Sequence, residues 1–337
     1  MNVFEMEIRC GKKNDLCFGL NSVTLSAKND LKMLKCVKGN RNRNVVSMKV
    51  VVITGGSKGL GYALAKQSLK FGHTTIIGAR NTIDLETAEN ALKRFIESEE
   101  LKVKVYANQL DVSDSQSIEQ FTDFVLSNTP QIDIWVNNAG SNSNVRRPLF
   151  NQTAEQITQV VDTNLKGTLL CCRNAICVMK VQENGGHIFN TDGAGVFGTP
   201  TPGYAAYGAT KRAIPQLMSS LNAELKKEGI DNVGVHTISP GLVLTELLLA
   251  DSTREIRVFM NFLAEEPDSV AEWLMPKILE TKGKGKYHKY LKIPQAFVKI
   301  GTGLVFRWNR YFDVKGKRIV KNPDLDQFTD SGTRKIL

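Results

Sequence analysis

Between residue 48 and about residue 240, short runs of β-branched residues alternate with stretches whose apolar residues recur at helical spacing. The candidate strands are residues 49–54, 74–79, 102–109, 132–137, 186–191 and 233–239. The candidate helices are residues 62–71, 85–99, 115–127, 153–179 and 205–227. Strict alternation predicts an α/β fold with a doubly wound parallel sheet and helices on both faces. In such a sheet the ligand crevice lies at the carboxyl ends of the strands.

The length and composition fit one large domain with extensions. The chain has 337 residues, of which 42% are hydrophobic and 23% are charged. We expect the domain over residues 48–280 and a basic N-terminal extension or transit peptide over residues 1–47. A basic, irregular extension is expected over residues 281–337. No run of about 18 consecutive apolar residues occurs, so the sequence predicts no membrane-spanning helix.

A glycine-rich loop, TGGSKGLG, directly follows the first candidate strand and opens the first helix. Its glycines permit a tight turn and close backbone approach, and the amides of the helix N-terminus can bind a pyrophosphate. This context predicts a Rossmann-like dinucleotide site, with a plain structural turn as the alternative. The expected cofactor-binding residues of the loop are Thr54, Gly55, Ser57, Lys58, Gly59, Leu60 and Gly61.

The end of the second strand indicates which dinucleotide binds. An acidic residue there binds the ribose 2'-hydroxyl of NAD, whereas a basic residue accommodates the 2'-phosphate of NADP. The strand ends in GARN, with Arg80 at this position, and Lys58 is a second cation within reach. We therefore expect NADPH. An exposed arginine on a solvated turn is the alternative.

The third and fourth strands end in the motifs LDV and NNAG. In a parallel sheet both motifs lie at the carboxyl edge, next to the ligand crevice. Asp111 is expected to approach the adenine, and the small Ala139 and Gly140 to let a cofactor lie flat. Their neighbours Val112 and Asn138 are expected to contact the cofactor too.

A Tyr-x-x-x-Lys pair can run hydride-transfer chemistry on a carbonyl. A nearby ammonium stabilises the phenolate and draws the tyrosine pKa from about 10 toward neutrality. Three such pairs occur in the chain, so the bare motif is weak. Only Tyr207 and Lys211 follow the fifth strand and open a helix. We expect Tyr207 to supply the proton and Lys211 to hold the cofactor ribose and tune the tyrosine.

In this order and spacing, TGxxxGxG, NNAG and YxxxK resemble the short-chain dehydrogenase/reductases over residues 48–245. The resemblance implies an NADP-dependent oxidoreductase in which Asn164 completes a proton relay. It also implies that Pro240, Gly241 and Thr245 hold the nicotinamide.

That family also has a serine shortly before the tyrosine, at a register where this chain has Ala194. The run NTDGAG and its flanks are similar to the chloroplast chlorophyll(ide) b reductases, which have N-x-DGAG where other members carry serine. Those enzymes reduce the 7-formyl group of chlorophyll b to 7-hydroxymethyl with NADPH. The resemblance implies chlorophyll(ide) b as substrate, with Gly193 and Ala194 leaving room for the flat macrocycle.

Asp192 is the candidate catalytic replacement for the missing hydroxyl. A water held by Asn190 or Thr191 is the alternative, and an aspartate that only caps the turn before Gly193 is another. For the whole chain, two other functions stay open. It could reduce another bulky apolar carbonyl, such as a steroid, retinal or acyl chain, or it could be a non-catalytic cofactor-binding scaffold.

The net charge of +10 is placed mainly in residues 1–49 and in the lysine-rich residues 281–292. These segments are either solvated surfaces or contacts to an anionic lipid or protein surface, with residues 296–306 as a further membrane contact. With the resemblance, this predicts a chloroplast protein peripheral to the thylakoid membrane, and a homo-oligomer. The sequence carries no nucleic-acid motif, no C-x-x-C pair and no expected metal ligands.

Overall fold

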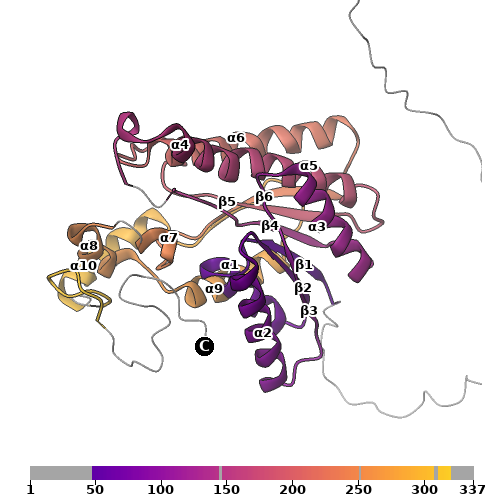
Figure 1. The fold of residues 1–337 in the computed structure, drawn as a ribbon, viewed down its shortest axis with the longest axis horizontal. Helices are drawn as coiled ribbons and strands as arrows, with labels where there is room; N and C mark the ends of the chain where they lie inside the picture. The colour runs from indigo at the N-terminus through magenta and orange to yellow at the C-terminus, as the bar shows by residue number, and fades with distance from the viewer. Residues whose placement is uncertain (1–47, 144–145, 250–251, 307–309, 320–337) are drawn as a thin grey trace, which may run out of the picture. The chain divides into compact units, whose positions relative to one another are not determined.

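The computed structural model describes residues 48–143, 146–249, 252–306 and 310–319, so the predicted extension over residues 1–47 lies outside the described residues. Seven parallel strands form one sheet in the order β3-β2-β1-β4-β5-β6-β7 (Figure 1). The strands are β1 (Val50–Thr54), β2 (Thr74–Ala79), β3 (Val105–Gln109), β4 (Ile134–Asn137), β5 (Gly186–Thr191), β6 (Val233–Ser239) and β7 (Tyr287–Lys289).

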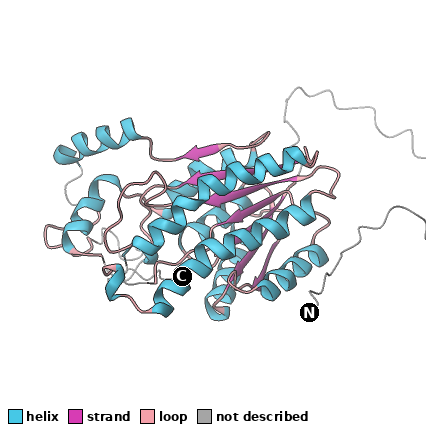
Figure 2. Ribbon diagram, turned by 90° about the horizontal axis from the view of Figure 1, so that it is seen from above, coloured by secondary structure: helices cyan, strands magenta, loops and turns pink. Residues whose placement is uncertain are grey.

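Helices connect the strands and cover both faces of the sheet, as Figure 2 shows from above. They are α1 (Gly59–Lys70), α2 (Thr82–Ser98), α3 (Ser115–Asn128), α4 (Ala154–Val161), α5 (Gly167–Met179), α6 (Ala205–Lys227), α7 (Glu246–Leu249), α8 (Arg254–Leu263), α9 (Pro267–Leu279) and α10 (Ile293–Phe306). The doubly wound α/β fold predicted from the strand-helix alternation is confirmed.

The two faces of the sheet are separated by the alternation of side chains along each strand. In β1, Val51 and Ile53 pack in one core cluster with α1, α2 and α9. Their neighbours Val50 and Val52 pack in a second cluster with α3, α5 and α6. β1 is therefore buried on both faces, as is typical of strands in a parallel sheet.

The predicted helix over residues 153–179 is interrupted by a π-helical turn, Asp162–Lys166, between α4 and α5. Such turns occur mostly inside α-helices and often at functional sites. The turn carries Asn164, whose side chain is fully buried. Hydrophobic periodicity cannot reveal this feature, because one extra residue in a turn barely shifts the apolar pattern.

Residues 281 onward were expected to be irregular, and this is wrong for two segments. Tyr287–Lys289 add β7 to the sheet, where Tyr287 pairs with Thr237 of β6. Ile293–Phe306 form α10, which packs on α8. The sequence did not predict β7, because a three-residue edge strand is too short to show an alternating pattern. The lysines and glycines before it, at residues 281–286, also favoured an irregular segment.

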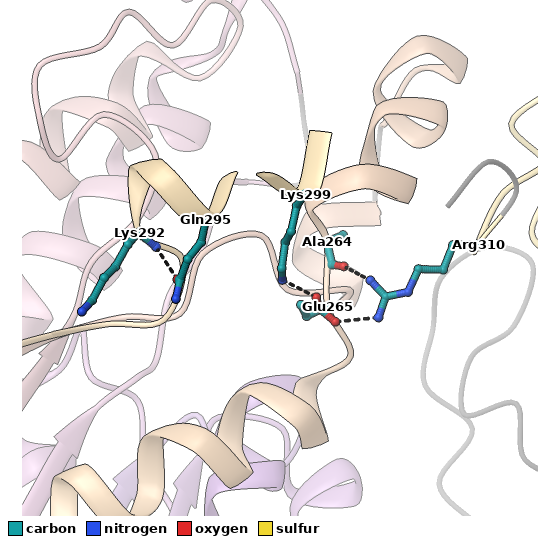
Figure 3. A network of polar contacts seen from close by, with 6 residues as sticks. All are labelled: Ala264, Glu265, Lys292, Gln295, Lys299 and Arg310. Carbon is teal, nitrogen blue, oxygen red and sulfur yellow. Dashed lines mark hydrogen bonds and ion pairs between the residues drawn. The ribbon is translucent and has the colours of Figure 1, made fainter. Parts of the chain in front are cut away.

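A buried carboxylate ties α10 to the rest of the domain. Glu265, at the junction of α8 and α9, forms ion pairs with Lys299 of α10 and with Arg310, and Arg310 also donates to the carbonyl oxygen of Ala264 (Figure 3). The Glu265 side chain is only 8% exposed. Burial works against its charged form, but hydrogen bonds from Arg310 and Lys299 hold its pKa below the ordinary value.

Candidate active site

A cavity of about 540 Å³ opens where the first six strands end. Most of the residues predicted from the sequence line it: Gly55, Ser57, Lys58, Gly59, Leu60, Arg80, Asp111, Val112, Asn138, Ala139, Gly140, Asp192, Tyr207, Lys211, Pro240, Gly241 and Thr245. Ala194 and Gly193, at the place of the missing serine, line it too. Three predicted residues, Thr54, Gly61 and Asn164, are not among the lining residues and support the wall from behind.

Thr54 joins the ends of β1 and β4. Its hydroxyl accepts hydrogen bonds from the backbone amides of Asn138 (3.1 Å) and Ala139 (3.0 Å). In return, the Asn138 side chain donates to the carbonyl oxygens of Thr54 and Gly55 (both 3.2 Å). A methyl group on Gly61 would lie 2.2 Å from the carbonyl oxygen of Gly55. The glycine loop and the NNAG segment are therefore fixed to each other before any ligand binds.

The start of α1 has the features of a phosphate site. Lys58 precedes the helix and makes no side-chain cap, and the first turn contains no acidic residue. Gly55 and Gly59 have positive φ angles of 66° and 52°, which glycine adopts without strain. The helix dipole and the uncapped amides favour an anion here, so these residues fit a dinucleotide pyrophosphate.

The two cations predicted to select the cofactor differ in their surroundings. Lys58 forms ion pairs with Asp84 of α2 (2.8 Å) and Glu246 of α7 (3.3 Å). Burial opposes its charge, yet these two carboxylates raise the pKa of Lys58. Arg80 is exposed at the end of β2 and lines the cavity. Arg80 is thus the more accessible of the two for a 2'-phosphate.

Asp111 begins the loop after β3. Its carboxylate accepts hydrogen bonds from the amide (2.9 Å) and the hydroxyl (2.6 Å) of Ser113, and its own amide donates to Ser117. This turn fixes Asp111 and Val112 in the cavity wall.

The glycine loop also contacts the segment after β6. A methyl group on Gly59 would lie 2.9 Å from the side chain of Thr245, so the two segments touch at this point.

Asn164 holds the loop after β4 instead of facing the cavity. Its side-chain oxygen accepts from the Ser141 amide (2.8 Å), and its amide group donates to the Ser141 carbonyl oxygen (2.8 Å). It also donates to the Thr210 hydroxyl of α6 (3.2 Å). The π-helical turn is therefore anchored to the loop after β4 and to α6. The proton relay expected of Asn164 stays a prediction.

Tyr207 lies in the first turn of α6, with its hydroxyl against Gly193. A methyl group on Gly193 would lie 2.2 Å from the tyrosine oxygen, so only glycine fits there. Burial and the charge of Asp192 both raise the pKa of Tyr207. The lowering of the Tyr207 pKa expected from Lys211 is therefore wrong for the unliganded protein, because burial and the Asp192 carboxylate outweigh the ammonium. The hydroxyl stays protonated at neutral pH, and it can donate its proton only where the phenolate left behind is stabilised.

Lys211 follows one turn later on the same helix. Its ammonium donates to the carbonyl oxygen of Thr191 (3.0 Å) and lies 5.7 Å from the centre of the Tyr207 ring. Burial lowers the pKa of Lys211 to about 8, although the charge of Asp192 opposes this. The pair predicted from three candidates is therefore brought together at the cavity.

Asp192 lies next to this pair and has a partner that the sequence analysis missed. The carboxylate accepts a hydrogen bond of 2.6 Å from the hydroxyl of Tyr287, and Asp192 is only 4% exposed. Burial raises the pKa of Asp192, while hydrogen bonds with Tyr287 and Ser239 and the nearby Lys211 charge act in the opposite direction. Tyr287 comes from β7, 95 residues further along the chain, so no local motif could have pointed to it.

Comparison with known proteins identifies the family. Residues 49–255, more than half of the chain, match the short chain dehydrogenase family. The chain belongs to this family. The short-chain dehydrogenase fold is also seen in a solved structure, the closed form of a serine dehydrogenase complexed with NADP⁺. That structure is 26% identical, has a TM-score of 0.60, and is matched over 73% of this chain and 96% of its own.

Among curated relatives of this short-chain dehydrogenase, chlorophyll(ide) b reductase NOL of Arabidopsis thaliana is 42% identical over 268 residues, which is 77% of this chain and 76% of the relative. Its namesake from Oryza sativa subsp. japonica is 41% identical over 268 residues, with 77% of each chain covered. Both relatives are described as chloroplastic. The protein is thus an NAD(P)-dependent oxidoreductase and a homologue of chlorophyll(ide) b reductases.

Two further observations concern the described residues only. They contain no cluster of three or more histidine, cysteine and acidic side chains that could hold a metal ion. None of their helices combines the length and the apolar character that crossing a bilayer requires.

Proposed function

We propose that this short-chain dehydrogenase uses NADPH to reduce the 7-formyl group of chlorophyll(ide) b to a 7-hydroxymethyl group, a reaction of chlorophyll b degradation. The observation that carries the proposal is the 42% identity to a chlorophyll(ide) b reductase, which extends over 268 residues. Identity at this level supports the reaction type more firmly than the substrate, so the substrate needs its own argument from the site.

The wall beside Tyr207 supports a wide, flat substrate. Where a hydroxyl-bearing side chain is usual for the family, the small residues Gly193 and Ala194 line the cavity, and Ala194 is exposed. Phe197, three residues further along and outside the cavity lining, is 59% exposed. A planar, largely apolar macrocycle gains free energy by covering such a surface, whereas a small alcohol or ketone would leave it wet.

When bound, NADPH supplies the hydride. The glycine loop and the N-terminus of α1 would hold its pyrophosphate, and the loops after β4 and β6 would hold the nicotinamide beside Tyr207. The carbonyl oxygen of the substrate gains negative charge as the formyl carbon is reduced. The hydroxyl of Tyr207 donates its proton to that oxygen, and Lys211 stabilises the phenolate left behind.

Asp192 would compensate for the missing serine. A serine hydroxyl would hydrogen-bond the substrate oxygen, and neither Gly193 nor Ala194 has a side chain that can do so. Asp192 lines the same cavity, and it would act by stabilising the charged Lys211 ammonium rather than by donating a hydrogen bond, because an ionised carboxylate only accepts and its charge raises the pKa of Tyr207. Asn164 would contribute through the backbone it anchors and through the proton relay implied by the family.

We infer NADPH rather than NADH from Arg80, whose position at the end of β2 fits a 2'-phosphate. Arg80→Ala is expected to weaken NADPH binding about tenfold or more and to leave NADH binding within about twofold, because a charge-assisted contact to a phosphate is lost. Fluorescence titration of both cofactors measures this. Equal weakening of both cofactors would contradict the assignment.

The proposed location is the chloroplast, at the surface of the thylakoid membrane. The exposed Lys292 directly precedes α10, which carries an exposed apolar pair, Phe297 (71%) and Val298 (63%). Such a combination favours contact with an anionic lipid surface. The predicted transit peptide and the predicted homo-oligomer remain part of this proposal.

The experiment is to incubate residues 48–337 with NADPH and chlorophyllide b, and to follow absorption and chromatographic mobility of the pigment. The expected product is 7-hydroxymethyl chlorophyllide a, and Tyr207→Phe is the control that should abolish it. If NADPH binds but the pigment is unchanged, the substrate proposal is wrong. A panel of steroid, retinal and acyl carbonyls then separates another bulky substrate from a non-catalytic scaffold.

A further inference from the structure

The hydrogen bond between Tyr287 and Asp192 connects the edge of the sheet to the active site. The tyrosine oxygen lies 2.6 Å from the carboxylate oxygen Oδ2. A short bond from a phenol to a carboxylate is charge-assisted, and such bonds are about twice as strong as neutral ones. Because Asp192 is only 4% exposed, water cannot readily replace the tyrosine as a partner.

Two contacts besides Asp192 position Tyr287, which is 38% exposed. The backbone of β7 pairs with β6 in register, with Tyr287 opposite Thr237. The ring meets Phe197 edge to face, with ring centres 6.2 Å apart. The Phe197 ring is in turn contacted by the ammonium of Lys289, which lies 4.3 Å from its centre. These contacts hold the tyrosine hydroxyl at the Asp192 carboxylate.

Asp192 faces charged and titratable groups from two elements, and the Ser239 hydroxyl at the end of β6 is a further hydrogen-bond partner. From β7 come Tyr287 and the charge of Lys289; from α6 come Lys211 and Tyr207. The Lys211 ammonium donates to the carbonyl oxygen of the residue immediately before Asp192, which places its charge beside the carboxylate. Lys211 is only 6% exposed, and a lone ammonium is costly at such a position.

We propose that Tyr287 is a positioning residue that holds Asp192 in its charged form beside Lys211, so that the buried ammonium keeps its proton while Tyr207 donates. The proposal rests on the proposed function only for the direction of the reaction, carbonyl reduction. The phenol of Tyr287 stabilises the carboxylate, and the carboxylate stabilises the Lys211 ammonium. Because the same carboxylate disfavours a phenolate on Tyr207, the ammonium has to stay charged to offset the negative charge that forms there.

The titration behaviour of the groups agrees with this geometry. The hydrogen bond from Tyr287 lowers the pKa of Asp192 against the effect of burial. The charge of Asp192 raises the pKa of Lys211 against the effect of burial, leaving it at about 8. Loss of the tyrosine hydroxyl should therefore make Asp192 easier to protonate and Lys211 easier to deprotonate.

The direct test is the titration of Lys211 in the unliganded protein. Protein labelled with [ε-¹³C]lysine is titrated by NMR, and the Lys211 signal is assigned by its absence in Lys211→Arg. We expect a midpoint near pH 8. Tyr287→Phe should lower it by roughly half a pH unit or more, and Asp192→Asn should lower it further, because it removes the charge itself. Tyr106→Phe, which removes a hydroxyl from β3 at the opposite edge of the sheet, should leave it unchanged.

Kinetics provides the second readout. In Tyr287→Phe, kcat should fall roughly three- to tenfold and the KM for NADPH should stay within about twofold, because Tyr287 is not among the residues lining the cavity. The high-pH limb of kcat/KM should move to lower pH with the NMR midpoint. An unchanged Lys211 midpoint in folded Tyr287→Phe overturns the proposal, whatever Asp192→Asn does. If Tyr287→Phe lowers the Lys211 midpoint but the wild-type protein does not reduce chlorophyllide b, the positioning role of Tyr287 is supported and only the proposed substrate is wrong.

Discussion

At the scale of single residues, the site depends on how closely Tyr207 approaches the backbone of Gly193. The absence of a side chain at Gly193 lets the tyrosine hydroxyl reach the cavity wall, and the absence of serine at Ala194 leaves that wall open. Lys211 and Asp192 then set the charge around the hydroxyl. In the proposed mechanism, proton donation by Tyr207 therefore depends on Gly193, Ala194, Lys211 and Asp192 rather than on the tyrosine-lysine pair alone.

Gly193→Ala should reduce kcat about a hundredfold, because the new methyl group displaces the Tyr207 hydroxyl by a distance on the scale of an ångström. Steady-state reduction of the formyl substrate measures this. Gly301→Ala is the matched control: it adds the same methyl group in α10, where no atom lies within 4 Å of it, and it should retain turnover. Full activity in Gly193→Ala would show that the observed position of Tyr207 is not the reactive one.

The reduction should also lose rate at high pH. Lys211 gives up its proton as the pH rises through about 8, and the phenolate that forms on Tyr207 then has no ammonium to stabilise it. Reduction should be fastest below this pH, and kcat/KM should fall above it by about tenfold per pH unit, as one titrating group requires. Lys211→Arg keeps its charge at all accessible pH values, so this limb should disappear. A wild-type profile that stays flat to pH 9.5 would contradict this role.

The residue scale also separates what sequence can predict from what it cannot. Tyr207, Lys211 and the glycine loop were found because each follows a strand and opens a helix, a context that the sequence itself displays. Tyr287 was missed because its role depends on the pairing of β7 with β6. That pairing joins segments far apart in the chain, and no local pattern encodes it.

At the scale of elements, three features outside the regular strand-helix alternation supply or fix residues around the site. β7 supplies Tyr287, the π-helical turn supplies Asn164, and the region of α8 and α10 is fixed by one buried carboxylate, Glu265. The six predicted strands and most helices followed from hydrophobic periodicity. These three features did not, because each rests on a polar contact or on a segment of only a few residues.

Glu265→Gln should lower the free energy of unfolding by about 1–3 kcal/mol, because a buried carboxylate that accepts from Lys299 and Arg310 loses its charge. The pKa of Glu265 is lower in the folded protein, so its contribution is complete above the unfolded pKa of about 4.5 and is lost as the pH falls through the folded value. Denaturant unfolding at pH 7 and pH 3 measures both. Glu246→Gln is the control: its pair with Lys58 is half-exposed and should change stability by less than about 1 kcal/mol. Equal effects of the two substitutions would contradict the account.

For the whole molecule, the short-chain dehydrogenase core sets the chemistry, and the segment after residue 280 adapts it. The core brings a phosphate site, a tyrosine and a lysine to one cavity at the strand ends. The later segment adds an edge strand that reaches the active site and a helix with exposed apolar side chains. Motifs and periodicity predicted the core and its cavity. The substrate was suggested only by resemblance, because no sequence motif determines the shape of a binding wall.

The most direct measurement uses NADPH carrying deuterium at both C4 positions, with chlorophyllide b as substrate and mass spectrometry of the pigment as readout. The account predicts a hydroxymethyl product with one deuterium on the former formyl carbon, and none from Tyr207→Phe. A pigment product without deuterium, or unchanged chlorophyllide b in the presence of bound NADPH, would contradict hydride transfer to this substrate.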